Sequence, residues 1–299
     1  MKDSVFSDFP WPSIPRLNEI PKWDEDEFSI NGKKQGSLIS YENVKSNWSE
    51  KLTELHEIEA GDGQHPIDSA SRNLALKSFS KITKEENKLI LEVGCSSGYM
   101  LQDFQKNLPH LYLMGADYLA APLKKLSQNL PKIPLLQFDL QNCPLPDDSV
   151  DGVVALNVLE HIERDEEALK HIYRILRPGG VAHIEVPANP NLYGIYDEYL
   201  MHHRRYTLFD IISKSRSAGF KIEFTTHLGF LIYPAFWMIK KLNRRHFSKT
   251  DEQKLEIVSK QIRQTSNSFL MKALIQLETK IGNFFQFPLG IRIVIKCQK

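Results

Sequence analysis

The hydrophobic pattern is most regular in the middle of the chain. Five short apolar runs recur there, at residues 89–93, 111–116, 133–138, 152–156 and 181–186. Each has the length of a buried strand, and stretches with helical spacing separate the later runs. Strands that alternate with helices predict a parallel sheet covered by helices on both faces.

Two further strands are predicted towards the C-terminus, at residues 220–226 and 290–298. The 63 residues between them, 227–289, are far too many for a simple connection. We therefore expect a helical insertion before the last strand.

Residues 1–85 precede the regular pattern and read as an N-terminal extension or cap. Three prolines occur by position 15, and the acidic stretch "WDEDEF" follows, which favours an irregular arm. The predicted organisation is thus an extension at 1–85, a core formed by 86–226 with 290–299, and an insertion at 227–289.

Composition narrows the class of protein. The 299 residues are 41% hydrophobic and 25% charged with a net charge of +1, which gives no electrostatic case for a nucleic-acid partner. Cys95, Cys143 and Cys297 form no C-x-x-C pair, which argues against structural zinc and a disulfide framework. The N-terminal stretch lacks a signal-peptide core, and the apolar segment 228–239 is too short to cross a bilayer. We expect a cytoplasmic protein.

The first strand of the pattern runs into the turn "EVGCSSG". Gly94 and Gly98 allow the backbone to approach a ligand, and the following helix would direct its N-terminus at it. Ser96 occupies the position of the middle glycine of G-x-G-x-x-G, and Tyr99 that of the third. The turn therefore suits a dinucleotide pyrophosphate less well than a smaller ligand.

Polar residues also follow the next strands, where open α/β sheets bind their ligands. Asp117 is placed to accept hydrogen bonds from a ribose diol, or alternatively to cap the next helix. Asp139 is placed to meet an exocyclic amine or to cap a loop. Asn157, Glu160 and His161 follow the fourth strand, where solvated loop residues are the alternative.

Residues 88–186 resemble a class I S-adenosylmethionine-dependent methyltransferase of the small-molecule and glycan-pathway type. The segments "LEVGCSSG", "GADY", "FDLQNCPLPDDSVDGVVALNVLEHI" and "ALKHIYRILRPGGVAHIEVP" match its motifs in order and spacing. The resemblance implies an α/β fold: a seven-stranded Rossmann-like sheet with helices on both faces, whose last strand is antiparallel.

The resemblance also implies a cofactor, S-adenosyl-L-methionine, and a set of contacts to it. The methionine part would lie against Glu92, Gly94, Ser96 and Gly98, and the ribose against Asp117. The adenine would meet Tyr118, Asp139 and Leu140, with Asn157 on the floor. Ser96 departs from the family's usual glycine. No ligand spacing demands a metal ion, and none is expected.

The acceptor site is expected in "YDEYLMHHRRYTLFDI", residues 196–211. His202 or His203 could accept a proton from a hydroxyl, and His161 is a further candidate base. Arg204, Arg205 and Tyr206 are candidate substrate-binding residues, since arginine binds carboxylate or phosphate. Alternatively the segment is structural, with Thr207 capping a helix and Arg205 paired to Asp197 or Glu198. His65 and Arg72 are candidates for closing the pocket.

The insertion joins bulky apolar side chains to a basic edge. Lys240, Lys241, Arg244, Arg245 and His246 directly follow the apolar part of 228–246. Such a segment suits an anionic membrane surface or a lipid-linked phosphate. The alternatives are a subdomain core with a solvated basic end or a dimer contact.

The sequence therefore predicts a methyltransferase that acts on a hydroxyl or carboxyl of a small molecule, sugar or lipid-linked glycan. Two other functions stay open at this point: a nicotinamide-dependent oxidoreductase and a non-catalytic S-adenosylmethionine-binding module. The acceptor's identity, the methylated atom and the oligomeric state are not assigned by the sequence.

Overall fold

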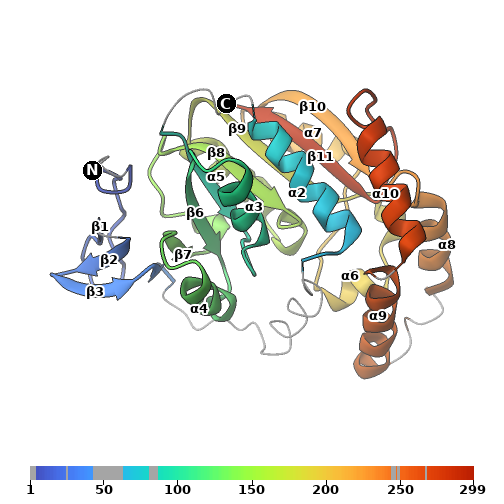
Figure 1. Cartoon of the computed structure of the whole chain (residues 1–299), viewed down its shortest axis with the longest axis horizontal. Coiled ribbons are helices and arrows are strands. Elements are labelled where there is room, and N and C mark those ends of the chain that lie inside the picture. Colours follow the sequence, from blue (N-terminus) through green and yellow to red (C-terminus); the bar gives the residue numbers. More distant parts are fainter. Residues whose placement is uncertain are drawn as a thin grey trace.

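The computed structural model describes residues 5–24, 26–42, 63–80, 87–243, 247, 250–266 and 268–299. Its centre is an eight-stranded sheet with the order β10-β11-β9-β8-β5-β6-β7-β4 (Figure 1). β11 pairs antiparallel with both of its neighbours, and the other neighbouring pairs are parallel. The strands are β10 (Lys221–Leu228), β11 (Arg292–Gln298), β9 (Leu176–Pro187), β8 (Val150–Leu156), β5 (Leu89–Val93), β6 (Tyr112–Asp117), β7 (Leu135–Gln137) and β4 (Leu38–Ser40).

Seven of these strands are the predicted ones, and the antiparallel last strand is confirmed. The central strand β5 is buried along its whole length because helices and other elements cover both faces of the sheet. The eighth strand, β4, comes from the predicted extension and pairs with β7 at the sheet edge. Three residues are too short for a periodic signal, so the sequence pattern did not reveal it.

The helices form two layers. α2 (Pro66–Phe79), α3 (Tyr99–Asn107) and α4 (Ala120–Asn129) supply one hydrophobic cluster with the sheet and lie at the front of Figure 1. α5 (Asp165–Ile175) and α7 (Leu208–Ser217) belong to the cluster on the opposite face. Shorter elements connect these layers: α6 (Ile195–Tyr199) and the 3-10 helices η2 (Leu140–Asn142), η3 (Leu159–His161) and η4 (Pro190–Leu192).

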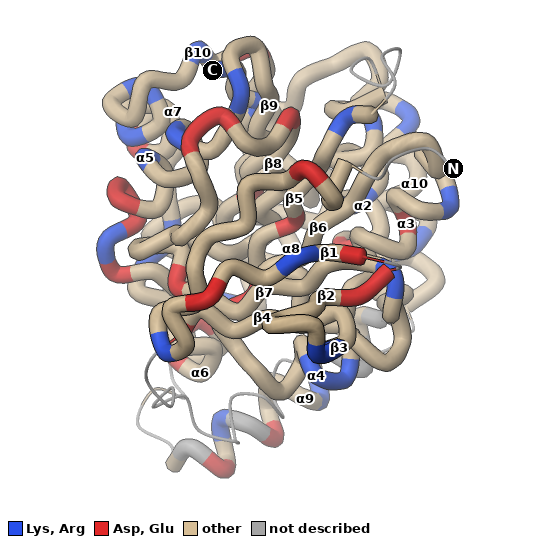
Figure 2. The backbone as a smooth tube through the Cα atoms, turned by 90° about the vertical axis from the view of Figure 1, so that its left-hand side faces the viewer, with Lys and Arg blue, Asp and Glu red and all other residues tan. Residues whose placement is uncertain are grey.

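The described part of the N-terminal extension is folded rather than an irregular arm. A three-stranded antiparallel sheet is made by β1 (Lys22–Asp24), β2 (Glu27–Ile30) and β3 (Lys33–Gly36). Phe6, Trp23 and Phe28 pack edge to face in its aromatic core, and Phe6 also contacts Tyr112 of the main sheet. Aromatic burial, which the proline content conceals, gives this segment its structure. Figure 2 shows acidic and basic residues interspersed on this side of the molecule.

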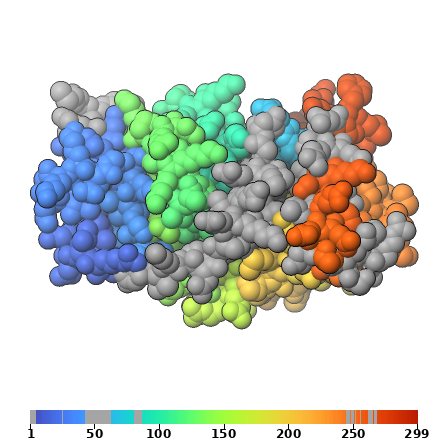
Figure 3. Space-filling model, turned by 90° about the horizontal axis from the view of Figure 1, so that it is seen from below, coloured from blue at the N-terminus to red at the C-terminus, as the bar shows by residue number. Residues whose placement is uncertain are grey.

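The predicted insertion is helical. It contains α8 (Tyr233–Asn243), α9 (Asp251–Ser266) and α10 (Phe269–Ile281), and it lies at the end of the molecule opposite the small sheet (Figure 3). α10 packs against α2, and α9 packs against α6. Arg244, Arg245 and His246, part of the predicted basic edge, fall outside the described residues. Among the helices that the structure describes, none is long and apolar enough to cross a bilayer.

Candidate active site

A cavity of about 780 Å³ runs along the carboxyl ends of the parallel strands. One half is lined by residues at the ends of β5, β6, β7 and β8, between Glu92 and Asn157, and we call this the donor half. The other half, here the acceptor half, is lined by η3, α2, the segment 196–205, α8, α10 and the start of β11. The predicted ligand-binding edge of the sheet is therefore the edge that carries the cavity.

The turn after β5 brings backbone close to this cavity. Gly94 and Gly98 have φ of 73° and 75°, and a Cβ atom on Gly94 would lie 2.5 Å from Val158 Cγ2. Ser96 also has a positive φ, 39°, although it is not glycine. Its N–H donates to Asp117 Oδ2 at 2.9 Å, which holds this residue in a conformation that side chains disfavour. Serine in place of glycine thus keeps the turn.

Asp117 ends β6 beside that turn and lines the cavity. Its Oδ1 accepts the N–H of Leu119 at 2.9 Å, directly before α4. The helix-start and cavity interpretations of Asp117 are therefore compatible, because a carboxylate has further lone pairs for a ligand. The side chain is only 9% exposed, so a ligand hydroxyl would meet it with little competing water.

Glu92 lies on the strand before the turn and also lines the cavity. Burial, followed by the negative charge of Asp117, raises the pKa of Glu92 well above its usual value. A buried carboxyl with a raised pKa is a frequent feature of functional sites.

The remaining predicted donor-half residues lie together at the cavity. Tyr118, Asp139, Leu140 and Asn157 all line it. Asp139 also accepts the N–H of Gln141 at 2.9 Å, so its predicted loop-capping role is present as well. Every residue that the family resemblance assigned to the cofactor therefore contributes to the lining of one cavity.

In the acceptor half, two histidines come together from separate segments. The rings of His161 and His202 lie 4.6 Å apart, centre to centre, and are nearly perpendicular. A carboxylate oxygen of Glu160 and ring nitrogens of His161 and His202, atoms able to coordinate a metal ion, lie within 4.8 Å of one another. All three residues line the cavity. His161 and His202 are 41 positions apart in the sequence, and the fold brings them together.

A buried carboxylate, Asp197, holds this region together. Its Oδ1 contacts His202 Nδ1 at 3.1 Å and Arg205 Nε at 2.6 Å, and its Oδ2 accepts from Lys240 Nζ at 2.7 Å. Burial opposes ionisation, but these partners outweigh it and hold the pKa of Asp197 well below its usual value. Burial, and then the charge of Arg205, lowers the pKa of Lys240 to about 8.

The rest of the predicted His/Arg segment does not line the cavity. His203 is exposed, and its backbone N–H donates to the Glu160 carbonyl at 2.7 Å. Arg204 and Tyr206 both bind Asp165, at 2.9 and 2.8 Å. Thr207 caps α7, and Arg205 pairs with Asp197, as the structural alternative predicted. The segment is thus divided: positions 196, 202 and 205 line the cavity, whereas the side chains of Arg204, Tyr206 and Thr207 bond to neighbouring parts of the fold.

A second buried ion network closes the cavity and was not predicted. Glu185 Oε1 accepts from Ser71 at 2.8 Å, Arg292 at 2.9 Å and Asn157 at 3.1 Å. Arg292 also reaches Asp68 at 2.5 Å. A glutamate inside the apolar run "IEVP" was the available signal, because buried acids need partners. His65 and Arg72 line the cavity as predicted, and Arg72 binds Asp103 at 2.6 Å.

The residues of the donor half fit the predicted cofactor. Gly94 and Gly98 present bare backbone to the cavity, and neither position admits a side chain because a Cβ on Gly98 would lie 2.4 Å from Leu126 Cδ1 and one on Gly94 2.5 Å from Val158 Cγ2. Asp117 offers a carboxylate to a diol at the second strand end. The open sheet with one antiparallel strand and a site at its strand ends defines a Rossmann-like class of protein.

Comparison with known proteins identifies the family. A profile of the methyltransferase domain family matches residues 91–184. A protein from Mycolicibacterium smegmatis, named as an S-adenosylmethionine-dependent methyltransferase, is 30% identical over 141 residues, covering 46% of this chain and 53% of that protein. Residues 91–184 therefore belong to a class I S-adenosylmethionine-dependent methyltransferase domain.

Other relatives are matched over similar parts of their length. A trans-aconitate 2-methyltransferase from Azoarcus sp. is 28% identical over 120 residues, covering 40% of this chain and 45% of that protein. The chain thus spans about half the length of these two curated relatives.

The fold is also that of solved methyltransferases. A phosphoethanolamine N-methyltransferase 2 from Haemonchus contortus, with S-adenosyl-L-methionine bound, superposes with a TM-score of 0.55 at 16% identity. The match covers 85% of this chain and 58% of that one. A protein from Galdieria sulphuraria described as a sarcosine dimethylglycine methyltransferase superposes with a TM-score of 0.57 at 12% identity. That match covers 84% of this chain and 98% of the other chain. At these identities the likeness concerns the fold.

Proposed function

We propose that this protein transfers a methyl group from S-adenosyl-L-methionine to a hydroxyl or carboxyl of an acceptor molecule. The observation that carries the proposal is the continuity of the cavity. The glycine turn, Asp117, His161 and His202 all line this one cavity. The family of residues 91–184 supports the donor, and the second half of the cavity supplies room for an acceptor.

The donor half would hold the cofactor by its separate parts. Gly94, Ser96 and Gly98 would admit the methionine portion, and Asp117 would accept hydrogen bonds from the ribose hydroxyls. When bound, S-adenosyl-L-methionine supplies an electrophilic methyl group with a neutral thioether as leaving group. The protein's own contribution is mostly positional, because displacement requires the acceptor atom, methyl carbon and sulfur in line.

The acceptor half would take the proton. His202 donates Nδ1–H to Asp197 when that carboxylate is ionised, which leaves Nε2 as the acceptor nitrogen. An acceptor hydroxyl would pass its proton to this Nε2 while its oxygen bonds to the methyl carbon. His161, 4.6 Å away ring to ring, is the second candidate base. A carboxylate acceptor would need neither, and the Azoarcus relative is named for such an acid.

Arg205 is the proposed substrate-side cation of the segment. It lines the cavity while Asp197 and the Ala188 carbonyl fix its guanidinium at 2.6 and 3.1 Å. The acceptor would be a small molecule, a sugar or a lipid-linked glycan with an anionic group near its methylated oxygen. Arg204 and Tyr206 would stabilise the fold of the segment through their bonds to Asp165 rather than bind the acceptor.

Calorimetry with S-adenosylmethionine and S-adenosylhomocysteine tests the donor half, and NADH serves as the control ligand. We expect binding of both sulfur compounds and none of NADH. Folded protein that binds neither would refute the proposal.

Turnover tests the acceptor half. The protein, cofactor and a cell extract are incubated, and methylated products are sought by mass spectrometry. For a hydroxyl acceptor, His202→Gln should lower product formation at least about 100-fold while leaving cofactor affinity unchanged. His203→Gln is the matched control and should retain activity, because His203 is exposed outside the cavity lining. Equal activity in both variants would remove His202 from the chemistry.

A further inference from the structure

We propose that the outer surface of α8 and α10 rests on an anionic lipid bilayer, and that the acceptor is an amphiphile taken from that bilayer. The binding surface stands by itself, whereas the acceptor class rests on the proposed methyl transfer. The two helices share a hydrophobic cluster with α2, through side chains that include Phe236 and Met271. Figure 3 shows the helical insertion that contains them at the end of the molecule opposite the small sheet.

Large apolar side chains on these helices face outward. Phe269 is 84% exposed, Leu270 67% and Met238 56%. Trp237 and Leu242 on α8 are exposed too, and the patch continues past α10 at Phe284 and Phe285. This many large exposed apolar side chains on two helices of one cluster favour an interaction surface over ordinary protein surface. Tryptophan and phenylalanine are typical of segments that insert at a membrane interface.

The charges on the same surface have one sign. Residues 227–243 contain no acid, and Glu278 is the single acid in 268–289. Glu278 is buried and accepts the N–H groups of Gly229 and Leu231 at 2.6 and 2.9 Å, so it adds no outward negative charge. Lys241, above the Trp237 ring at 4.9 Å, is exposed, as is Lys272. The surface is therefore apolar and cationic, which matches anionic headgroups above acyl chains.

A second copy of the chain fits this surface less well. In a symmetric dimer the patch would meet itself. Lys241 and Lys272 would then face other lysines with no outward carboxylate from either helix to neutralise them. Anionic lipid supplies the missing counter-charge, so the charge pattern favours a bilayer over self-association.

The mouth of the cavity opens on this surface. Ile239 and Leu270 both line the cavity and are exposed, at 40% and 67%. Ile232 just before α8, Phe236 on α8 and Leu274 on α10 add apolar lining, and Lys240 and Asn243 of α8 add buried polar lining. An acyl or isoprenoid chain would lie against the apolar side chains while its polar head reached His161 and His202. An acceptor could thus pass from the bilayer to the site along apolar side chains.

Vesicle co-flotation of the full chain tests the surface. The probes are vesicles of phosphatidylcholine alone and vesicles in which one quarter of the lipid is phosphatidylglycerol. Binding to the anionic vesicles should be at least about tenfold stronger and should weaken as salt rises. The double variant Lys241→Glu/Lys272→Glu should lose at least about tenfold in binding, and Trp237→Ser/Phe269→Ser a similar factor.

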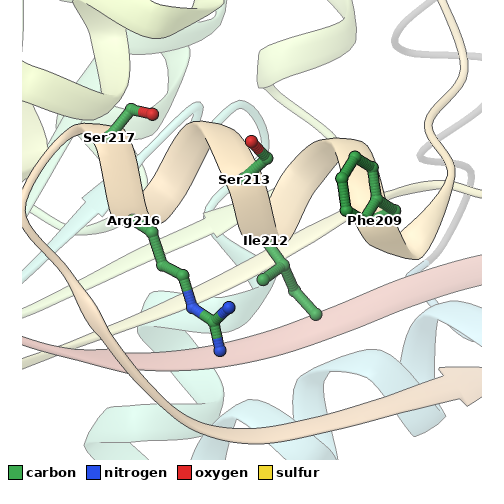
Figure 4. Close-up of a pocket in the computed structure, with 5 residues that line it drawn as sticks. All are labelled: Phe209, Ile212, Ser213, Arg216 and Ser217. Atoms are coloured by element: carbon green, nitrogen blue, oxygen red, sulfur yellow. The ribbon is translucent and has the colours of Figure 1, made fainter.

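Phe209→Ser is the matched control. Phe209 is 79% exposed on α7, where Ile212 and Arg216 lie beside it in a separate hollow (Figure 4). This variant should bind vesicles as the unmodified protein does. Calorimetry with S-adenosylmethionine shows that each variant is folded, because none of the substituted residues lines the cavity.

Two results would overturn the proposal. One is a protein that binds the cofactor but does not bind anionic vesicles. The other is a stable dimer in solution that becomes monomeric in the double variant Trp237→Ser/Phe269→Ser. Vesicle binding without any cofactor binding would instead refute the proposed function and still support the proposed membrane-binding surface. For the acceptor class, methylated product should appear in the organic phase of a lipid extraction. Product confined to the aqueous phase would contradict it.

Discussion

The two halves of the cavity are built in different ways. The donor half comes from consecutive strand ends within one stretch, between Glu92 and Asn157. The acceptor half is assembled from α2, the segment 196–205, α8, α10 and the start of β11, which lie far apart in the chain. Local backbone geometry determines the first, whereas long-range packing determines the second. Changes in one half should therefore leave the function of the other intact, and the following predictions test this.

The largest effect is expected from Asp197→Asn. It would weaken the contacts to Arg205 and Lys240 and leave two buried cations without their carboxylate. Breaking a buried ion pair costs about 3–5 kcal/mol, so unfolding free energy should fall by roughly that amount. With a hydroxyl acceptor, turnover should fall at least about 100-fold because His202 loses its orientation. Denaturant unfolding measures the free energy of unfolding, and product formation measures turnover.

Cofactor affinity serves as the contrast for Asp197→Asn. Calorimetry on folded variant protein should give a dissociation constant close to that of the unmodified protein, because Asp197 does not contact the donor half. A large loss of cofactor affinity would show that the halves are coupled.

The next effect concerns the donor half. Asp117→Asn removes the charge that would hold the ribose, and hydrogen bonds to charged groups contribute about 1.5–3 kcal/mol. Affinity for S-adenosylhomocysteine should fall about 10- to 100-fold by calorimetry. Asp147→Asn, at an exposed carboxylate on the surface, is the control and should bind normally. Unchanged affinity in Asp117→Asn would mean that the ribose lies elsewhere.

A third prediction uses acid to loosen the acceptor half. The pKa of Asp197 is lower in the folded protein than its ordinary value of 3.8, despite burial, because His202, Lys240 and Arg205 favour the charged form. Its contribution to stability is present above pH 3.8 and is lost as pH falls through the folded pKa. The stability gap between unmodified protein and Asp197→Asn should therefore narrow below about pH 4. A gap that stays constant in acid denaturation profiles would contradict this.

The smallest effect is expected from Thr207→Ala. Thr207 caps α7, and its Oγ1 accepts the Asp210 N–H at 3.1 Å. Loss of such a cap costs about 1 kcal/mol. Thermal unfolding should show that cost, while cofactor affinity and turnover stay unchanged. Lost turnover would place residue 207 in the acceptor site, contrary to its position in the structure.

The donor half was readable because each of its residues follows a strand that the hydrophobic pattern reveals. Gly94, Asp117, Asp139 and Asn157 occupy strand ends, and parallel strands bring those ends to one edge. The helical insertion was predictable from length alone. The strand β4 and the aromatic core of β1–β3 were not, since their pairing depends on contacts with distant residues such as Tyr112.

By itself the sequence determined seven strands of the main sheet and the family of residues 91–184, because these depend on local periodicity and short-range turns. Only the tertiary structure decided which of two neighbouring histidines faces the cavity. His202 turns inward because buried Asp197 holds it with Arg205 and Lys240, while His203 turns out to solvent. Such a choice depends on burial and charge compensation between segments far apart in the chain, and a linear pattern does not contain that information.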